Sequence, residues 1–391
     1  GVTVGIFAII TVLTFVDSLE RNIRESLNFL GNDIIYVNKW DFLPESDGVY
    51  RWWEVMRRPN VSYFEYNMLS DNLKHASALA ISADRGGLTV KSGNNSFSDA
   101  DLSGISYTYK DTDELDIEFG RYFTPSESAA GRNVAIVGAE IATTLFPNNS
   151  NPVGETMKVR NIKFVVIGVQ KREGESFLGT PSADESVLVP YNSFRKLYQT
   201  GTGAVNEAQS VISIKGKESD IGLVELENEI VGMMRKMRGL KPKEKKNFAI
   251  NRPEALGAVL DGLFGVLNLA GWIIGGFSIL IGGFGIANIM FVSVKERTGI
   301  IGLQKSLGAK NYFILFQFLF ESIFLSLIGG LAGLLLVYLI TLIPMGSLEV
   351  KMSFANVMVG LGVSSVIGML SGIIPSARAA SLDPVIAIRS S

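Results

Sequence analysis

The chain has 391 residues, of which 47% are hydrophobic and 19% charged, and its formal net charge is −2. So small a net charge gives no long-range attraction to nucleic acid or to another polyanion. The sequence holds no cysteine and a single histidine, His75, so it offers no disulfide framework and no thiolate or histidine-rich metal site. We predict no catalytic cluster and no metal centre, and we expect His75 to be a surface or helix-cap side chain.

The first 16 residues form an apolar run without a charge. As a helix they extend about 24 Å at ~1.5 Å per residue, which is short for a bilayer core of ~30 Å. Either the span begins before Gly1, or the run is a signal peptide; neither a basic leader nor a cleavage site is visible. Apolar residues continue at helical spacing, so we predict a transmembrane helix over 1–16 that continues into a stalk. These residues are Leu19, Ile23, Leu27 and Leu30.

Residues 17–258 carry most of the charge and have a mixed pattern. Short β-branched runs predict strands, and longer amphipathic stretches predict helices, the longest with Ile221, Val224, Ile230 and Met234 on one face. Asn161 between two strand-like runs suits a hairpin turn. Polar stretches at 92–99 and 200–207 suggest an inserted subdomain over about 94–204. The predicted strands are 34–37, 134–137, 163–169, 186–190 and 210–214, and the predicted helices are 61–74, 139–146, 191–199 and 218–238.

Three further apolar segments follow, at 262–294, 311–343 and 354–377, with Glu321 as their only charged residue. Each exceeds the roughly 20 residues that cross a bilayer, so each is a predicted span. The first is long enough to project beyond the bilayer as a second stalk. The predicted fold is therefore a membrane all-α bundle of four spans plus a large mixed α+β domain over 17–258, with the last three spans in a domain over 259–391.

The loop at 295–310 is basic, whereas the connection at 344–353 is balanced. Because cytoplasmic loops carry an excess of lysine and arginine, we expect the loop to face the cytoplasm and residues 17–258 to lie outside. The basic stretch at 241–246 argues the other way, but long translocated domains are largely exempt from this rule. The basic residues of the loop are Lys295, Arg297, Lys305 and Lys310.

Glycines in the spans are spaced four apart, a pattern that lets helix backbones approach closely. We predict that these pairs mark helix contacts, either within one chain or between chains. The pairs are Gly271 with Gly275, Gly329 with Gly333, and Gly368 with Gly372.

Glu321 lies about ten residues into its span, with Gln317 one turn earlier. A carboxylate at this depth must pair, take up a proton or reach the headgroups. Two interpretations stay open: a polar tie between helices, or a structural carboxylate at the inner interface.

The loop reads VKERTGIIGLQKSLGAKNYF and is short and amphipathic. Ile300, Ile301, Leu303 and Leu307 give it an apolar side, which suits either docking into a protein groove or lying on the lipid surface.

The segment from Glu296 to Gly333 resembles the FtsX-like permease domain. The resemblance implies that the loop contacts an ATPase, through Glu296, Arg297, Thr298, Ile301, Gly302, Leu303, Leu307 and Gly308. Gly299 and Gln304 depart from the family pattern, which usually has glutamate and often arginine there. The closing segment GIIPSARAASLDPVIAIR is also similar to that family, and the stretch from GRYF at 120–123 to PVG at 152–154 resembles MacB-like extracytoplasmic domains.

These resemblances imply the permease subunit of a MacB-like ABC transporter in the bacterial inner membrane. The chain has no G-x-x-x-x-G-K-[ST] motif, so ATP and Mg²⁺ would be bound by a partner ATPase, or by a fused one upstream of Gly1. The implied action is mechanotransmission for efflux. Further implied partners are a second permease subunit, a periplasmic adaptor or lipoprotein, and the lipid membrane. Alternatives are a lipoprotein-releasing permease, and a regulator of cell-wall enzymes or a sensor without a transported substrate.

Overall fold

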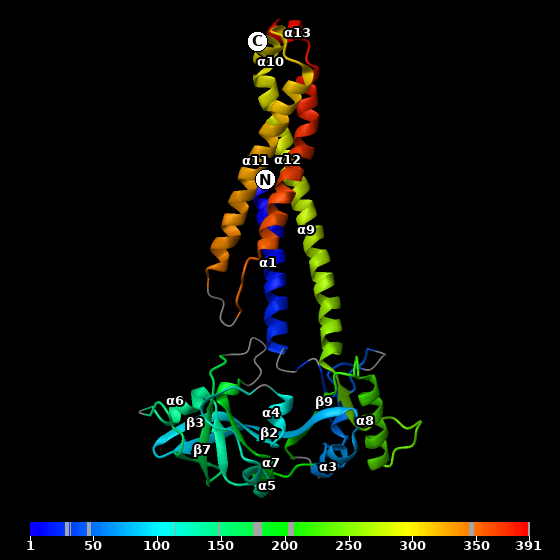
Figure 1. Cartoon of the computed structure of the whole chain (residues 1–391). Helices are drawn as coiled ribbons and strands as arrows, with labels where there is room; N and C mark the ends of the chain where they lie inside the picture. Colours follow the sequence, from blue (N-terminus) through cyan, green and yellow to red (C-terminus); the bar gives the residue numbers. More distant parts are fainter. Residues whose placement is uncertain are drawn as a thin grey trace. The chain divides into compact units, whose positions relative to one another are not determined.

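The computed structural model describes residues 1–389 except 28–30, 32, 45–47, 114, 148, 175–181, 202–206 and 344–347. Its contacts divide the chain into two compact units (Figure 1). The α/β unit contains Arg24–Val259, and the helical unit contains Gly1–Ile23 together with Leu260–Ser391.

The α/β unit is built on one sheet of ten strands, in the order β10-β1-β9-β2-β3-β8-β5-β7-β4, with β6 paired to β2 and β7. The five predicted strands are present, and so is β6, the strand-like run before Asn161; β2, β3, β4 and β10 join them. The strands are β1 Ile34–Asn38, β2 Ala76–Ser92, β3 Asn95–Ile105, β4 Ile117–Gly120, β5 Val134–Val137, β6 Thr156–Val159, β7 Ile162–Gln170, β8 Ser186–Pro190, β9 Gln209–Gly216 and β10 Ala249–Asn251.

Short helices accompany the sheet. The predicted helices at 61–74, 139–146 and 191–199 are confirmed with slightly shorter bounds. They are α2 Trp52–Met56, α3 Tyr63–Asn72, α4 Tyr109–Thr112, α5 Pro125–Ala130, α6 Ala139–Leu145, α7 Tyr191–Leu197 and α8 Val224–Met237, with a 3₁₀ turn η2 at Ala183–Glu185.

Asn161 forms the predicted turn between β6 and β7. Arg160 and Asn161 have φ angles of 48° and 67°, and two consecutive left-handed residues are what a tight hairpin requires. Val159 then pairs with Ile162 across the turn.

The predicted phase of the long helix at 218–238 is wrong at its start. Leu223 adopts a left-handed conformation with φ 53°, so the helix begins only at Val224. Ile221 lies before it and is 93% exposed, and Val224 is also exposed. The buried face is instead formed by Leu226, Ile230 and Met234.

Strands within the predicted inserted subdomain, about 94–204, belong to the same ten-stranded sheet as the strands outside it. Residues 92–99 form the turn and first residues of the β2–β3 hairpin, and 202–206 lie outside the described residues. The contacts place residues 94–204 in the same unit as the rest of Arg24–Val259.

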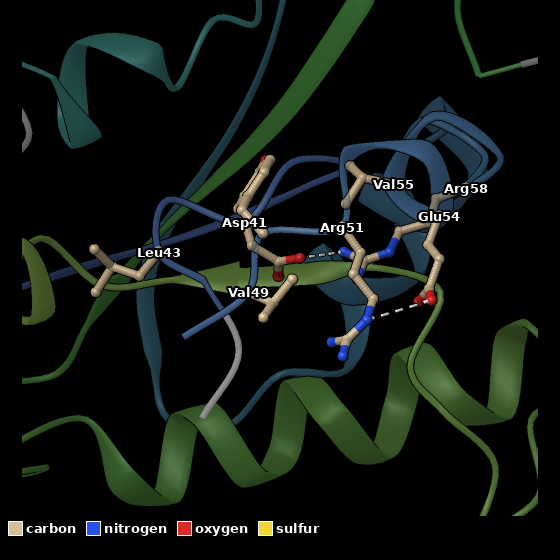
Figure 2. Close-up of a pocket in the computed structure, with 8 residues that line it drawn as sticks. Asp41, Leu43, Val49, Arg51, Glu54, Val55 and Arg58 are labelled. Atoms are coloured by element: carbon tan, nitrogen blue, oxygen red, sulfur yellow. Dashed lines mark hydrogen bonds and ion pairs between the residues drawn. The ribbon is translucent and has the colours of Figure 1, made fainter. Parts of the chain in front are cut away.

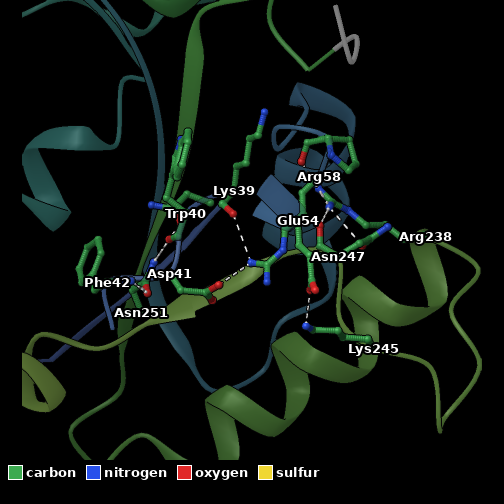
Figure 3. A network of polar contacts seen from close by, with 12 residues as sticks. Lys39, Trp40, Asp41, Phe42, Glu54, Arg58, Arg238, Lys245, Asn247 and Asn251 are labelled. Atoms are coloured by element: carbon green, nitrogen blue, oxygen red, sulfur yellow. Dashed lines mark hydrogen bonds and ion pairs between the residues drawn. The ribbon is translucent and has the colours of Figure 1, made fainter. Parts of the chain in front are cut away.

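Described residues between β1 and α3 make ion pairs among themselves and further polar contacts with the end of the α/β unit. Arg58 Nη1 lies 2.7 Å from Asp41 Oδ2, beside a small pocket at the start of α2 (Figure 2). Lys245 reaches Glu54 at 2.5 Å, and Asn251 holds the backbone of the residues after β1 (Figure 3). Trp52 and Trp53, in α2, are exposed.

The helical unit contains α1 Val2–Leu27 as far as Ile23, α9 Pro253–Glu296 from Leu260 on, α10 Thr298–Ser306, α11 Asn311–Thr341, α12 Phe354–Ser381 and α13 Pro384–Arg389. Among the described residues, four helices are long and apolar enough to cross a membrane: α1, α9, α11 and α12. The predicted fold class of four apolar helices and a mixed α/β domain is confirmed. Leu30, the last residue of the predicted stalk pattern, lies outside the described residues.

The G-R-x-F sequence at 120–123 has a local structural role. Arg121 makes two 2.8 Å hydrogen bonds to Glu127, which also closes a capping box with Thr124 at the start of α5. Phe123 is buried. The Arg121 guanidinium holds the pKa of Glu127 at about 2, well below its usual value.

We predict that Arg121→Ala destabilises the α/β unit by about 1 kcal/mol at pH 6, because the capping carboxylate loses its partner. A carboxyl group whose pKa is lower in the folded than in the unfolded state stabilises the fold at pH values above its unfolded pKa. This stabilisation is lost as the pH falls through the folded-state pKa. The difference between variant and parent should therefore vanish between about pH 4.5 and 2. Thermal unfolding of the detergent-solubilised parent and variant at pH 6 and at about pH 2 measures this difference in stability. A difference that persists at about pH 2 would contradict the assignment.

Candidate functional site

The connection between α9 and α11 folds as a short helix, α10, after a one-residue interruption at Arg297. Thr298 Oγ1 donates to the carbonyls of Val294 and Lys295, at 3.0 and 2.8 Å, and stabilises this turn. At the other end, Gly308 has a φ of 98°, which a residue with a side chain would adopt only with strain.

The two faces of α10 differ. Ile301 is 1% exposed and packs with Gly302 toward the helical unit. Ile300, Leu303 and Leu307 are 59%, 55% and 81% exposed. The four apolar residues predicted to share one side of this helix therefore lie on two sides: Ile301 is in the core of the helical unit, and the other three are exposed.

An ion pair joins this connection to α11. Arg297 Nη1 lies 3.1 Å from Oε2 of Glu321, 24 residues further along the chain. Of the two interpretations of Glu321, this geometry favours a tie between segments. Gln317 is exposed one turn earlier.

A second tie joins α10 to α12. Lys305 Nζ donates to the carbonyls of Ala380 and Leu382, at 2.7 and 2.6 Å. These carbonyls lie at the end of α12, where a cation also interacts favourably with the helix dipole. Helix α13 then packs against α10, with Val385 and Ile386 exposed beside it.

The remaining loop residues lie at the ends of α10. Glu296 is the exposed last residue of α9, and Leu307 follows α10 directly. Gln304, one of the two departures from the family pattern, has a buried Oε1 without a hydrogen-bond partner among the described residues.

Helices α11 and α12 meet along a row of small residues. Ser322 donates to the carbonyl of Gly368 at 2.8 Å, and Ser326 to that of Ser364 at 2.6 Å. A Cβ on Gly368 would lie 2.8 Å from the Cα of Ile323, and one on Gly372 would overlap Ser322. Glycine is therefore required for this spacing.

Helix α1 packs against the other three spans through glycines. A Cβ on Gly271 or Gly275 of α9 would lie 2.8 and 2.4 Å from the side chains of Val12 and Ile9. On α11, Gly333 approaches the Thr3 carbonyl so that a Cβ would lie 3.0 Å away, and Gly329 lies beside the same turn. On α12, Gly360 lies against Ile10. All these contacts are within one chain.

His75 contacts two carboxylates within the α/β unit. His75 is 3.0 Å from Glu225 and 3.1 Å from Glu229, with one carboxylate at each ring nitrogen, so it joins β2 to α8. Within the described residues, no group of three or more ligating side chains could hold a metal ion.

Neither the ion pair of Arg297 with Glu321 nor the contact of Lys305 with the end of α12 can be predicted from the sequence. Arg297 and Glu321 are both candidate site residues, but nothing in their spacing indicates that they form a pair. Lys305 stands out in the sequence only as one of the basic residues of the loop. Its partners are backbone carbonyls, which leave no sequence signal.

We predict that Arg297 and Glu321 are energetically coupled by about 0.2–1 kcal/mol, the range of exposed ion pairs. Arg297→Ala and Glu321→Ala should each lower the melting temperature of the detergent-solubilised chain. The double variant should lose less than the sum of the two, because the second change has no pair left to break. Strict additivity would show that the two side chains do not interact. Lys310→Ala, which changes another basic residue of the same loop, is the matched control.

The family of the MacB-like periplasmic core domain matches residues 1–221, and that of the FtsX-like permease C-terminal domain matches residues 272–384. The chain is 29% identical over its whole length to the macrolide export ATP-binding/permease protein MacB of Marinobacter nauticus, of which it covers 57%. It is also 29% identical over its whole length to the uncharacterized ABC transporter permease YknZ of Bacillus subtilis, of which it covers 93%. The chain thus spans little more than half the length of several curated relatives that it matches.

Among solved structures, the periplasmic region of MacB from Actinobacillus actinomycetemcomitans is similar at 20% identity and a TM-score of 0.47. The match covers 61% of this chain and 97% of that one. The two family matches together cover most of the sequence, including α10 and the helices that it ties together. The chain is a multi-pass membrane protein that belongs to the MacB-like, FtsX-like family of ABC transporter permeases.

Proposed function

We propose that the chain is the permease part of a MacB-like export machine in the bacterial inner membrane and transmits motion rather than catalysing chemistry. ATP and Mg²⁺ are bound by an ABC ATPase, either a separate subunit or a fused region. The ATPase docks on α10, and its closure and opening displace the helical unit. The displacement reaches the α/β unit on the other side of the membrane, where it drives export.

The observation that carries this proposal is the attachment of α10 to every span that it adjoins. It follows α9 after one residue, binds α11 through Arg297 and Glu321, and binds the end of α12 through Lys305. A force on α10 is therefore shared among three long helices. A helix that merely lay on lipid would need none of these ties.

Helix α9 suits the transmission of motion because it is unbroken. Its 44 residues would extend about 66 Å at ~1.5 Å per residue, whereas about 20 residues cross a bilayer. Its first turns, up to Val259, already belong to the α/β unit. A single unbroken helix, α9, thus leads from the α/β unit to α10.

The exposed face of α10 supplies the docking surface. Ile300, Leu303 and Leu307 stand one turn apart on one side of the helix, which is the pattern of a helix that binds in a groove. The loop that carries these residues is basic, which supports a position for α10 in the cytoplasm, the compartment that contains ATP.

A second permease subunit would pair along α9. Exposed apolar residues recur there every three or four positions, the spacing of a helix–helix seam. Gly262 and Gly276 also lie on α9, and apart from the adjacent residues and the helix backbone no atom of the described residues lies within 4 Å of a Cβ placed on either of them. The exposed residues are Val259, Leu263, Val266, Leu269, Ile273, Phe277, Leu280 and Phe284.

We predict that Leu303→Asp weakens ATPase binding at least about tenfold, because docking would bury a charge without a partner. Co-purification of the ATPase with the chain from native membranes measures this. Where the ATPase is fused, loss of ATP-driven motion replaces loss of binding.

Ile221→Asp is the matched control, since it places the same charge at a fully exposed site of the α/β unit. It should leave the complex intact. If the ATPase stays bound to Leu303→Asp as firmly as to the parent chain, docking on α10 is wrong.

A further inference from the structure

Side chains at the outer end of α1 hold the chain just before α12 by its backbone. Ser18 Oγ accepts from the N–H of Lys351 at 3.1 Å and donates to its carbonyl at 3.3 Å. One turn later, Asn22 Nδ2 donates to the carbonyl of Glu349 at 3.1 Å, and Asn22 Oδ1 accepts from its N–H at 3.3 Å. Two side chains thus satisfy both backbone groups of alternate residues, as a neighbouring strand would.

A third contact extends this arrangement into α12. Asn356, in the first turn of α12, donates to Asp17 Oδ2 at 2.9 Å and lies 3.5 Å from Thr14 Oγ1. Thr14, Ser18, Asn22 and Asn356 are all buried. We call this group the polar clasp: Thr14, Asp17, Ser18, Asn22, Asn356 and the backbone of residues 349–351.

The polar clasp differs in kind from the other contacts of α1. The glycine contacts with α9, α11 and α12 are van der Waals contacts, which change little when one helix slides by a fraction of an ångström. Hydrogen bonds depend steeply on distance and angle, and a buried polar group that loses its partner costs about 1–3 kcal/mol. The polar clasp therefore fixes the position of α1 along the α11–α12 pair.

Building on the proposed function, we propose that the polar clasp makes α1 a second output helix of the machine. Motion of α10 enters α11 through Arg297 and Glu321 and enters α12 through Lys305. The serine and glycine row holds α11 and α12 together. The polar clasp then passes their displacement to α1.

Helix α1 is suited to carry this displacement onward. It continues without a break from the polar clasp to Leu27, and its residues from Arg24 on belong to the α/β unit. The α/β unit is thus driven through two helices, by α9 through the chain itself and by α1 through the polar clasp. Ser18, Asn22 and Asn356 are positioning residues, because they touch neither ATP nor cargo.

The test uses the whole chain with its ATPase in lipid nanodiscs. Because the sequence has no cysteine, Ile221→Cys gives a single, exposed spin-label site on each α/β unit, and the distance between the α/β units of two copies of the chain can be measured. The parent pair should show an ATP-dependent change in this distance. Ser18→Ala with Asn22→Ala should reduce that change by at least half, while ATP hydrolysis continues.

Two controls separate transmission from general damage. Glu349→Gln with Lys351→Gln alters side chains whose backbone alone the polar clasp binds, and Ser18→Thr keeps the hydroxyl; both should keep the full change. Asn356→Leu, which removes only the bonds to Thr14 and Asp17, should give an intermediate loss and serves if the double variant does not fold.

The outcomes distinguish the two proposals. A full distance change in the variants that lack the polar clasp would show that α9 suffices and would overturn this inference alone. No ATP-dependent change in the parent pair would contradict the proposed function, and this inference with it.

Discussion

A bilayer core offers a peptide backbone no hydrogen-bond partners, so a crossing segment must find them within the protein, and an α-helix finds them within itself. Helix α9 meets this requirement for 44 residues and does not stop where the apolar phase would end. The same hydrogen bonds that make crossing possible make the helix stiff. Under the proposed function, docking at one end of α9 and export at the other can therefore be coupled without a moving chemical group.

Two kinds of contact divide the work inside the helical unit. Glycines and serines let the spans approach closely, and they give α1 its central position among α9, α11 and α12. Other polar contacts lie toward the ends of the spans, where Arg297, Lys305 and Asn22 join helices to loops and helix termini. Lipid gives no hydrophobic drive for helix association, so specific packing and hydrogen bonds must supply it.

Much of the fold was predictable because its signals are local. Apolar runs long enough to span, β-branched strands such as Val134–Val137, and Asn161 at a hairpin turn each follow from a few adjacent residues. β2 and β3 were missed because they are rich in serine, alanine and glycine and lack a β-branched run. The phase of α8 was wrong because the left-handed Leu223 cannot be read from sequence.

The candidate site was only half predictable for a similar reason. Motif residues such as Ile301 and Leu303 were found, but one turned out to be buried and the other exposed. The contacts of Lys305, Ser18 and Asn22 were invisible because their partners are backbone groups, which every residue has. Long-range pairs such as Arg297 with Glu321 depend on the path of the chain, which single-sequence spacing does not encode.

The central claim is that the α/β unit and α10 lie on opposite sides of one membrane. Because the chain has no cysteine, Ile221→Cys and Lys310→Cys each provide a single, exposed thiol, and Lys310 lies outside the proposed docking face. With a membrane-impermeant maleimide on cells whose outer surface is accessible, the account predicts that the Ile221→Cys thiol reacts at once and the Lys310→Cys thiol only after the membrane is opened. Equal labelling of both in intact cells would contradict it.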